Sequence, residues 1–575
     1  MVRTGWKSAF VLWLAAALGW PTGAAADAPR DVTNSQRLWL DGLDIYGTDN
    51  GSGIGSRPSS GSSVTSWKDK SANLYSATAV SGSAPVATAE GISCNGSQII
   101  KVATGIFPTG TGVTEAEIFA VASTAADSSS FAFYNGSTGT NHLGFAIPWG
   151  DTIYWDHNAT GGRVTASWSG NASAYNTTYL WNFFTGGTVQ VIARNGANLS
   201  FLSLSPIYTP DASHSLSLCG GDGGFYNGSI SEVIVYSRRL LNAEKNIILS
   251  YLAAKYANPG GAGSLSKYSP PGNFRYHVGG IGQDVDGSLA TGTSAGLTIA
   301  NNTFLSSGRY LLAGVDSINP ANGTTTADVP TGYTRRSSRV WYLQRTVSGG
   351  SPGNVSLTFN LAQLGISASS GTTLAVASRS GTTGQFSTVS TATYNGSGSV
   401  TFSVTGPATG YYVLAGTLTG TPKLTLNLGS QVVSDTINTA NFKAIPGALV
   451  RGSALVTNTG GGSPDSNSTV FSLAVPTNAK FYLGDIGTAG SGPVTITQGS
   501  PSSALTYTYT SLGSTTDGLD FSNNSGTSWT YSPTPDAQQA DAAITNVRVR
   551  LSGTFATGTS PNFPSFTVNY GVVVK

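Results

Sequence analysis

The sequence predicts an all-β protein made of antiparallel sandwiches, and three observations lead to this class. Turn-forming Gly, Asn, Ser and Pro recur at short intervals, with 74 Gly among the 575 residues. Between the turns lie alternating or β-branched runs such as residues 117–121 (EIFAV), 189–193 (VQVIA) and 355–359 (VSLTF), a pattern typical of sandwiches. Only 10% of the residues are charged and 39% are hydrophobic, which excludes coiled coils and intrinsic disorder.

The first 26 residues have the pattern of a Sec-type secretory signal peptide. Arg3 and Lys7 precede an apolar run over residues 9–20, and three Ala at 24–26 precede Asp27. The run is too short for a stable membrane span, and no second apolar run long enough to span follows it. We therefore expect a secreted or cell-surface protein without a membrane span after the signal peptide is removed.

Charge narrows the classes of partner. Without the signal peptide the chain has 27 Lys and Arg (29 minus 2) and 27 Asp and Glu, so its net charge is zero. Lys and Arg are also not clustered in the sequence. We therefore expect neither nucleic acid nor an anionic membrane surface as a partner.

One segment predicts a helix, and two Gly-rich or turn-rich stretches predict domain boundaries. Asn242 is the expected N-cap of this helix, and its apolar stripe, which we expect to pack on the first domain, consists of Ile247, Ile248, Tyr251 and Leu252. Residues 259–264 (PGGAGS) and 416–422 (GTLTGTP) mark the boundaries. The predicted parts are the signal peptide (1–26) and domains at 27–258, 259–417 and 418–575.

Motifs in the first domain resemble a known family. Residues 38–44 (LWLDGLD), 64–73 (VTSWKDKSAN) and 226–238 (YNGSISEVIVYSR) are similar to the opening and closing motifs of bacterial LamG-type, concanavalin A-like lectin/glucanase modules. The resemblance covers about residues 35–256. It implies a two-sheet jelly roll that ends in a short helix.

The other two domains show weaker resemblances. Residues 278–284 (VGGIGQD) and 339–343 (RVWYL) look like an uncharacterised β-domain that often follows such modules in bacterial surface proteins. Residues 444–450 (AIPGALV) and 456–460 (VTNTG) are similar to immunoglobulin-like conserved-repeat domains of secreted bacterial proteins. The chain departs from that last pattern at Arg451-Gly452, where a Tyr usually stands. None of these resemblances identifies a ligand.

Acidic residues are the first candidates for catalysis, because hydrolysis of sugars needs two carboxylates about 5 to 9.5 Å apart. Glu115 and Glu117 would face the same side of one strand. The related glucanases carry three acids at alternate positions, but Val113 and Phe119 stand at the flanking positions here. We therefore interpret the pair as a solvated strand edge.

A second pair of acids and the histidines give no stronger catalytic signal. Asp151 and Asp156 would face opposite sides of one strand, which favours a role in a turn or in shaping a ligand site. The histidines, without the spacing of a zinc site, are His142, His157, His214 and His277. No serine or cysteine nucleophile stands in a recognisable motif, and we expect no enzyme.

A structural calcium is the one cofactor that the sequence suggests, since modules of the LamG type often hold one at the rim. Its candidate oxygen ligands are Asp41, Asp44, Asp69 and Asn73. Residues 284–288 (DVDGS) mimic the start of a calcium loop, but Ala295 stands where such a loop requires Glu. In both places the alternative is an Asp that caps a turn.

Cys94 and Cys219 are the only cysteines. In an oxidising compartment they can form a disulfide. The alternative, two half-buried thiols in separate strands, stays open.

A ligand-binding patch is predicted in the first domain, where six of the eleven Trp lie. Its candidate residues are Trp149, Asp151, Tyr154, Trp155, His157 and Arg163. Trp and Tyr rings can stack on a sugar, and Asp and Arg can bond its hydroxyls. Alternation places one of the neighbouring rings of Tyr154 and Trp155 inward, so we expect part of this set to be core.

Export, the sandwich pattern and low charge lead us to expect recognition or adhesion, with a glycan or a surface protein as the ligand. Two other classes stay open: a carbohydrate-active hydrolase, and a purely structural surface or matrix component that associates through exposed edge strands.

Overall fold

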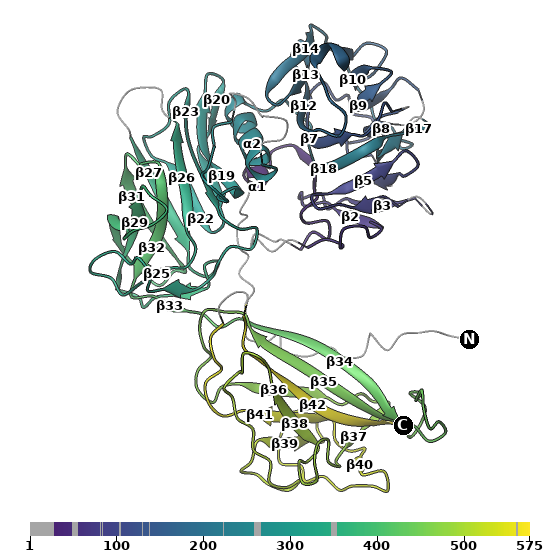
Figure 1. The fold of residues 1–575 in the computed structure, drawn as a ribbon, viewed down its shortest axis with the longest axis vertical. Coiled ribbons are helices and arrows are strands. Elements are labelled where there is room, and N and C mark those ends of the chain that lie inside the picture. Colours follow the sequence, from purple (N-terminus) through teal and green to yellow (C-terminus); the bar gives the residue numbers. More distant parts are fainter. Residues whose placement is uncertain are drawn as a thin grey trace.

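The computed structural model describes residues 28–48, 56–80, 82, 84–102, 105–128, 130–136, 139–221, 223–257, 266–346, 353–558 and 562–575. The predicted signal peptide lies outside these residues. Strands make up 46% of the structure and helices 4%, and the strands form three sandwiches that follow one another along the chain (Figure 1). The predicted all-β class of jelly-roll and antiparallel sandwiches is confirmed, and the three strand runs named above lie within β7, β13 and β27.

The first sandwich has two eight-stranded sheets, and the chain crosses between them repeatedly, as in a jelly roll. The first sheet contains β1 (Gln36–Asp41), β4 (Val86–Ala87), β5 (Ile92–Asn95), β7 (Ala116–Thr124), β12 (Thr178–Gly186), β13 (Val189–Arg194), β14 (Ala197–Leu202) and β18 (Asn227–Tyr236). The second contains β2 (Ser66–Lys68), β3 (Ser76–Ala79), β6 (Ile100–Val102), β8 (Phe133–Gly136), β9 (His142–Trp149), β10 (Thr152–His157), β11 (Arg163–Ser167) and β15 (Ser215–Leu218). A small hairpin of β16 (Gly220–Gly221) and β17 (Gly224–Phe225) follows β15.

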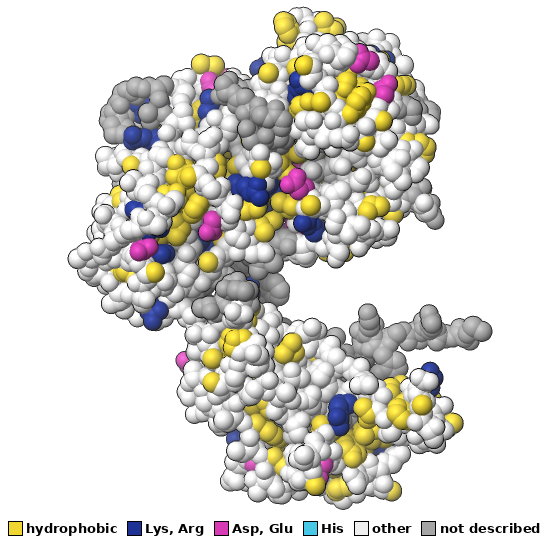
Figure 2. Space-filling model, in the orientation of Figure 1, with side chains coloured by type: hydrophobic (Ala, Val, Ile, Leu, Met, Phe, Trp, Pro, Cys, Tyr) yellow, Lys and Arg dark blue, Asp and Glu magenta, His cyan; other side chains and the backbone are white. Residues whose placement is uncertain are grey.

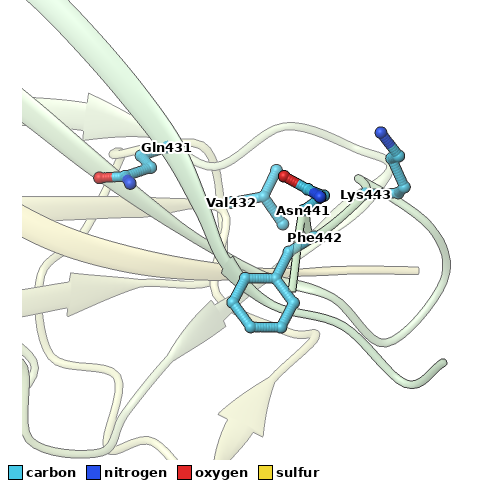
Figure 3. A pocket seen from close by; sticks show the side chains of 5 residues that line it. All are labelled: Gln431, Val432, Asn441, Phe442 and Lys443. Atoms are coloured by element: carbon cyan, nitrogen blue, oxygen red, sulfur yellow. The ribbon is translucent and has the colours of Figure 1, made fainter. Parts of the chain in front are cut away.

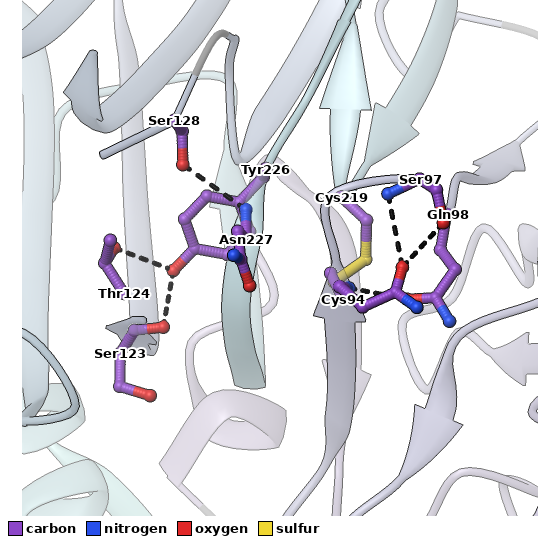
Figure 4. The surroundings of a disulfide bond; sticks show 10 residues. Cys94, Ser97, Gln98, Ser123, Thr124, Ser128, Cys219, Tyr226 and Asn227 are labelled. Atoms are coloured by element: carbon purple, nitrogen blue, oxygen red, sulfur yellow. Dashed lines mark hydrogen bonds between the residues drawn. A yellow bond between two sulfur atoms is a disulfide. The ribbon is translucent and has the colours of Figure 1, made fainter. Parts of the chain in front are cut away.

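A disulfide joins the two sheets of the first sandwich (Figure 4). Cys94 lies in β5 of the first sheet, and Cys219 follows β15 of the second; their Cα atoms are 5.6 Å apart. Nearby, the phenol of Tyr226 donates to the carbonyl oxygen of Ser123 at 2.7 Å. Of the two alternatives that the sequence left open, the structure has the paired one.

The second sandwich follows helix α2 (Asn242–Lys255). Its nine-stranded sheet contains β19 (Tyr276–Asp284), β20 (Gly287–Leu289), β23 (Arg309–Val315), β24 (Thr324–Thr325), β25 (Arg335–Ser337), β26 (Trp341–Thr346), β29 (Thr373–Arg379), β30 (Ser387–Thr393) and β32 (Gly410–Gly416). Its four-stranded sheet contains β21 (Thr291–Ser294), β22 (Leu297–Asn301), β27 (Asn354–Asn360) and β31 (Ser399–Thr405), and a separate pair is formed by β28 (Ile366–Ser367) and β33 (Thr419–Gly420).

Helix α2 is buried on both sides, between the first two sandwiches (Figure 1). Its apolar residues share one core cluster with Trp39 and Phe119 of the first sandwich and with Tyr310 and Leu312 of the second. The helix was predicted to pack on the first domain, and it does so with one face. Its other face packs on the second sandwich, which was not predicted. Its N-cap is Leu241, one residue before the predicted Asn242.

The third sandwich has a six-stranded and a three-stranded sheet. The larger contains β34 (Leu424–Ser434), β35 (Leu449–Asn458), β37 (Ala479–Tyr482), β38 (Val494–Gln498), β40 (Ala540–Asp541) and β42 (Ser565–Val574). The smaller contains β36 (Val470–Ala474), β39 (Leu519–Ser522) and β41 (Asn546–Arg550). This sandwich approaches the second through glycine backbone: a Cβ on Gly461 would lie 2.7 Å from the Cα of Gly323.

Within the described residues, none of the helices is long and apolar enough to cross a membrane. Two short helices complete the structure, α1 (Ala28–Asp31) and the 3-10 helix η2 (Ser169–Asn171). On the face shown in Figure 2, charged side chains appear as scattered spots and not as a continuous patch.

Candidate binding surface

The predicted patch centres on the hairpin of β9 and β10, in the second sheet of the first sandwich. Gly150 and Asp151 form its two-residue turn, with φ of 60° and 56°, the left-handed conformation that type I′ hairpins require and that Gly and Asp tolerate. Along β10, side chains alternate between the core and the outer face of the sheet. The six predicted residues are therefore divided between two environments.

Trp155 and His157 point into the core and have no exposed surface. The indole of Trp155 donates to the hydroxyl of Thr185 at 3.1 Å, and its ring lies 5.8 Å from that of Phe183. Nε2 of His157 lies 2.7 Å from the carbonyl oxygen of Val113, and burial lowers the pKa of His157 to about 4. Both side chains are structural, which corrects their assignment to the ligand patch.

Tyr154 and Trp149 lie on the outer face, so Trp155 is the inward one of the two neighbouring rings that alternation separates. Their ring centroids are 5.9 Å apart, and Phe131 lies 5.8 Å from Trp149 on the same face. Gly144 makes room for Phe131, because a Cβ there would lie 3.0 Å from its ring. Trp149 is 37% exposed and Phe131 is buried, so Trp149 is the accessible end of an aromatic cluster.

Arg163 continues this outer face on β11. Its guanidinium lies 4.9 Å from the centroid of the Tyr154 ring, and it forms two hydrogen bonds to Asp156, at 2.7 and 2.6 Å. The Arg163 side chain is 41% exposed, whereas that of Asp156 is fully buried. Trp149, Tyr154 and Arg163 therefore lie side by side on this surface as an indole, a phenol and a guanidinium. The buried carboxylate of Asp156 holds the guanidinium in place.

Asp156 is held by two partners. Besides Arg163, Nε2 of His142 lies 2.9 Å from its carboxylate, and Nδ1 of His142 lies 2.8 Å from the carbonyl oxygen of Gly139. Burial alone would raise the pKa of Asp156, but the hydrogen bonds from Arg163 and His142 hold it below its ordinary value. The carboxylate is ionised and fixes the Arg163 guanidinium over Tyr154.

His142 was not predicted to belong to this surface, whereas Asp156 was given a role in a turn or in shaping a ligand site, which fits its contact with Arg163. The signal for Asp156 was the short β10–β11 connection, which pairs Asp156 with Arg163. His142 comes from the neighbouring strand β9, and its approach to Asp156 depends on a β9–β10 register that a bulge shifts between Thr152 and Tyr154.

Asp151 holds the neighbouring loop. Its carboxylate accepts hydrogen bonds from the backbone N–H of Ser169 at 3.0 Å and from its hydroxyl at 2.7 Å. These bonds lower the pKa of Asp151. Asp151 therefore connects the hairpin turn to η2, a turn role as predicted from its spacing to Asp156.

The predicted acid pair of β7 is not a solvated edge. Glu117 is fully buried and accepts hydrogen bonds from the backbone N–H of Leu240 at 2.7 Å and from the side chain of Asn182 at 3.0 Å. Burial raises the pKa of Glu117. Glu115 lies 3.3 Å from the backbone N–H of Arg239. Both acids serve the segment that leads from β18 into α2, because its backbone donors need acceptors.

Lysines lie at the predicted calcium ligands. Lys70 Nζ lies 2.9 Å from Asp41 and 3.3 Å from Asp44, and Lys255 Nζ lies 2.7 Å from Asp41. Asp69 accepts backbone N–H groups, among them that of Trp39 at 2.8 Å. The side-chain amide of the fourth candidate, Asn73, donates to the carbonyl oxygens of Gln36 and Arg37. In the described part of the chain, no three His, Cys, Asp or Glu residues are arranged to hold a metal ion.

The second calcium-like motif, residues 284–288, binds protein groups at the start of helix α2. Both carboxylate oxygens of Asp286 accept from the backbone N–H of Asn242, at 3.1 and 3.0 Å. Asp284 accepts from the hydroxyl of Tyr310 at 3.0 Å, and Tyr310 in turn accepts from Asn246 of α2 at 2.9 Å. This loop of the second sandwich therefore caps and anchors α2.

An open pocket of about 510 Å³ lies on the third sandwich (Figure 3). Gln431 and Val432 of β34 line it together with Asn441, Phe442 and Lys443 of the following loop. It carries one charge and no pair of acids, so it offers no catalytic arrangement.

Comparisons with known proteins give the following similarities. No protein-family model matches the chain, and no curated protein matches it in sequence. Among solved structures, domain 4 of an extracellular arabinanase from Geobacillus stearothermophilus, in complex with arabinotriose, is 12% identical over 36% of this chain and 94% of that one, with a TM-score of 0.24.

Two further solved structures are similar at the same level. A pentraxin from Limulus polyphemus is 11% identical over 26% of this chain and 76% of its own, with a TM-score of 0.21. A botulinum neurotoxin binding domain is 10% identical over 66% and 94%, with a TM-score of 0.28. TM-scores this low do not establish a shared fold.

Proposed function

We propose that the chain is an exported recognition or adhesion protein that binds a glycan through the outer face of β9, β10 and β11. We further propose that its first sandwich is a LamG-type module and that it is not an enzyme. The observation that carries this proposal is the row of Trp149, Tyr154 and Arg163.

The chemistry of this row suits a sugar. An exposed indole offers a flat apolar face to the C–H groups of a pyranose ring, and a guanidinium donates hydrogen bonds to its hydroxyls. The row is also preorganised, since the turn of the hairpin and the Asp156 contact fix the rings and the cation before any ligand arrives.

Two observations support the rest of the proposal. The disulfide between Cys94 and Cys219 is typical of an oxidising, extracellular compartment. Glu117 and Asp156, one from each of the two acid pairs that were weighed for catalysis and set aside, are fully buried and bound to protein groups. A hydrolase would instead need two carboxylates that a substrate can reach.

The test is binding of the full mature chain to a glycan array, followed by calorimetry with the sugars retained. We expect Trp149→Ala to weaken binding about tenfold and Trp149→Phe to keep part of it. Phe201→Ala is the matched control, because Phe201 is 65% exposed on the other sheet. A chain that binds no glycan, or an equal loss in both alanine variants, contradicts the proposal.

A further inference from the structure

Strand β34 forms an open edge of the third sandwich. It pairs with β35 on one side, and within the described residues no strand pairs with its other side. Eight of its eleven residues are exposed, including Leu424 at 37% and Leu428 at 39%. Figure 2 shows hydrophobic side chains gathered where this strand approaches the C-terminal end of the chain.

The strand has one device that protects such an edge, a β-bulge between Val432 and Ser434, but it lacks the others. Lys, Pro and inward-facing charges keep edge strands from pairing with other chains, but residues 424–434 (LTLNLGSQVVS) contain no charged residue and no Pro. The charges stand at the two ends instead, with Lys423 before the strand and Asp435 after it. Lys423 is exposed. Asp435 is half-buried, and its carboxylate already accepts hydrogen bonds from the loop over residues 437–443, so Lys423 of a second copy would be a further donor to it.

We propose that β34 pairs antiparallel with β34 of a second copy of this chain, about a two-fold axis at Gly429. This register sets all eleven residues of one strand opposite those of the other, and the bulge at Val433 then lies opposite Thr425 of the second copy. It also sets Lys423 of each copy opposite Asp435 of the other, so two pairs of opposite charge close the ladder at its ends. The strand thus has a charge pattern complementary to itself.

The side chains along the ladder match in the same register. Leu426 lies opposite Val432 of the second copy, and Asn427 lies opposite Gln431. Leu426 and Val432 both pack partly against the core of the third sandwich, so they share one face of the sheet. Val432 lines the pocket with Phe442 (Figure 3), and Leu426 of the second copy therefore arrives beside that pocket.

The geometry points to a closed dimer. At the other edge of the six-stranded sheet lie β40, with two residues, and β38, with five. Both are shorter than β34 and offer a further copy less backbone to pair with. A self-complementary contact that uses one edge per molecule stops at two.

Sedimentation velocity of the full mature chain up to ~200 μM tests the association, and we expect a concentration-dependent dimer. Lys423→Glu should raise the dissociation constant of the dimer about tenfold or more, because like charges then face each other at both ends. Lys480→Glu is the control, with the same change of charge in the same sandwich but on β37, which β35 and β42 separate from β34. A monomer throughout the series, or an equal effect of both variants, overturns the proposal.

Cysteine crosslinking tests the register. The two native cysteines are bonded to each other, so an introduced thiol is the only free one. Gly429→Cys places two thiols at the axis, where we expect rapid oxidation to a covalent dimer. Thr425→Cys faces Val433 of the second copy and should crosslink much more slowly. Equal rates overturn the register about Gly429.

Discussion

At the residue scale, His157 makes the stability of the first sandwich depend on pH. Burial lowers its pKa from 6.5 to about 4, so the folded protein keeps the imidazole neutral. The unfolded chain takes up a proton near pH 6.5 and therefore binds more protons between that pH and pH 4. Its free energy of unfolding falls as the pH drops through this window, and the shift corresponds to about 3 kcal/mol.

We predict that His157→Gln flattens this pH dependence, because a glutamine amide can still donate to Val113 but does not titrate. The measurement is the free energy of urea unfolding at several pH values from about 7 down to 4. His277→Gln serves as the control, since His277 contacts the carbonyl oxygen of Ile318 in the second sandwich. Equal pH slopes in the wild type and in His157→Gln would refute the assignment.

The sequence could predict part of the binding surface at this scale. Strand alternation correctly separated Tyr154 from Trp155, because it depends only on neighbours along the chain. The hydrogen bonds that fix Arg163 through Asp156 and His142 could not be predicted in the same way. They require Asp156 and His142 to meet across the β9–β10 pair, whose register is shifted by a bulge between Thr152 and Tyr154, and alternation along one strand does not predict a bulge.

At the element scale, helix α2 depends on groups from outside itself. The carboxylate of Glu244 accepts from the backbone N–H of Leu241 at 2.9 Å, and Asp286 of the second sandwich accepts from the next donor, that of Asn242. Acids here also suit the positive end of the helix dipole. The second sandwich therefore supplies one of the caps of a helix that belongs to the first.

We predict that Asp286→Ala lowers the free energy of unfolding by about 1 kcal/mol, the usual effect of losing a capping acceptor. Asp286→Asn keeps an acceptor and should recover most of this loss. Both are measured by urea unfolding monitored by circular dichroism. A loss in Asp286→Asn as large as that in Asp286→Ala would show that the acceptor is not what matters.

Helix α2 also shows which part of its burial the apolar residues in its sequence could predict. Ile247, Ile248, Tyr251 and Leu252 predicted one buried face, which the structure confirms. Both faces also contain polar groups. Asn246 is bonded to Tyr310 of the second sandwich, and Lys255 is bonded to Asp41 and Glu232 of the first. From the sequence alone such residues would be predicted to be solvent-exposed, because the neighbouring residues do not show that a distant partner forms a hydrogen bond with them.

At the scale of the whole molecule, the three sandwiches differ in how they are connected. One hydrophobic cluster combines Trp39 and Phe119 of the first with Leu312 of the second through α2. Asp31 of α1 adds a bond to the backbone N–H of Thr293 in the second sandwich at 2.7 Å. The third has a core of its own, with no residue from the other two. We therefore expect the first two to unfold together and the third separately.

Calorimetry of the full chain should show two transitions, and reduction of the disulfide should identify them. The bond closes a separation of 125 residues within the first sandwich, and its loss should cost about 4 kcal/mol through the greater freedom of the unfolded chain. Because α2 couples the sandwiches, reductant should shift the transition of the first two and leave that of the third unchanged. One transition, or a shift of both, would mean that the third sandwich is coupled to the others more strongly than its glycine contact indicates.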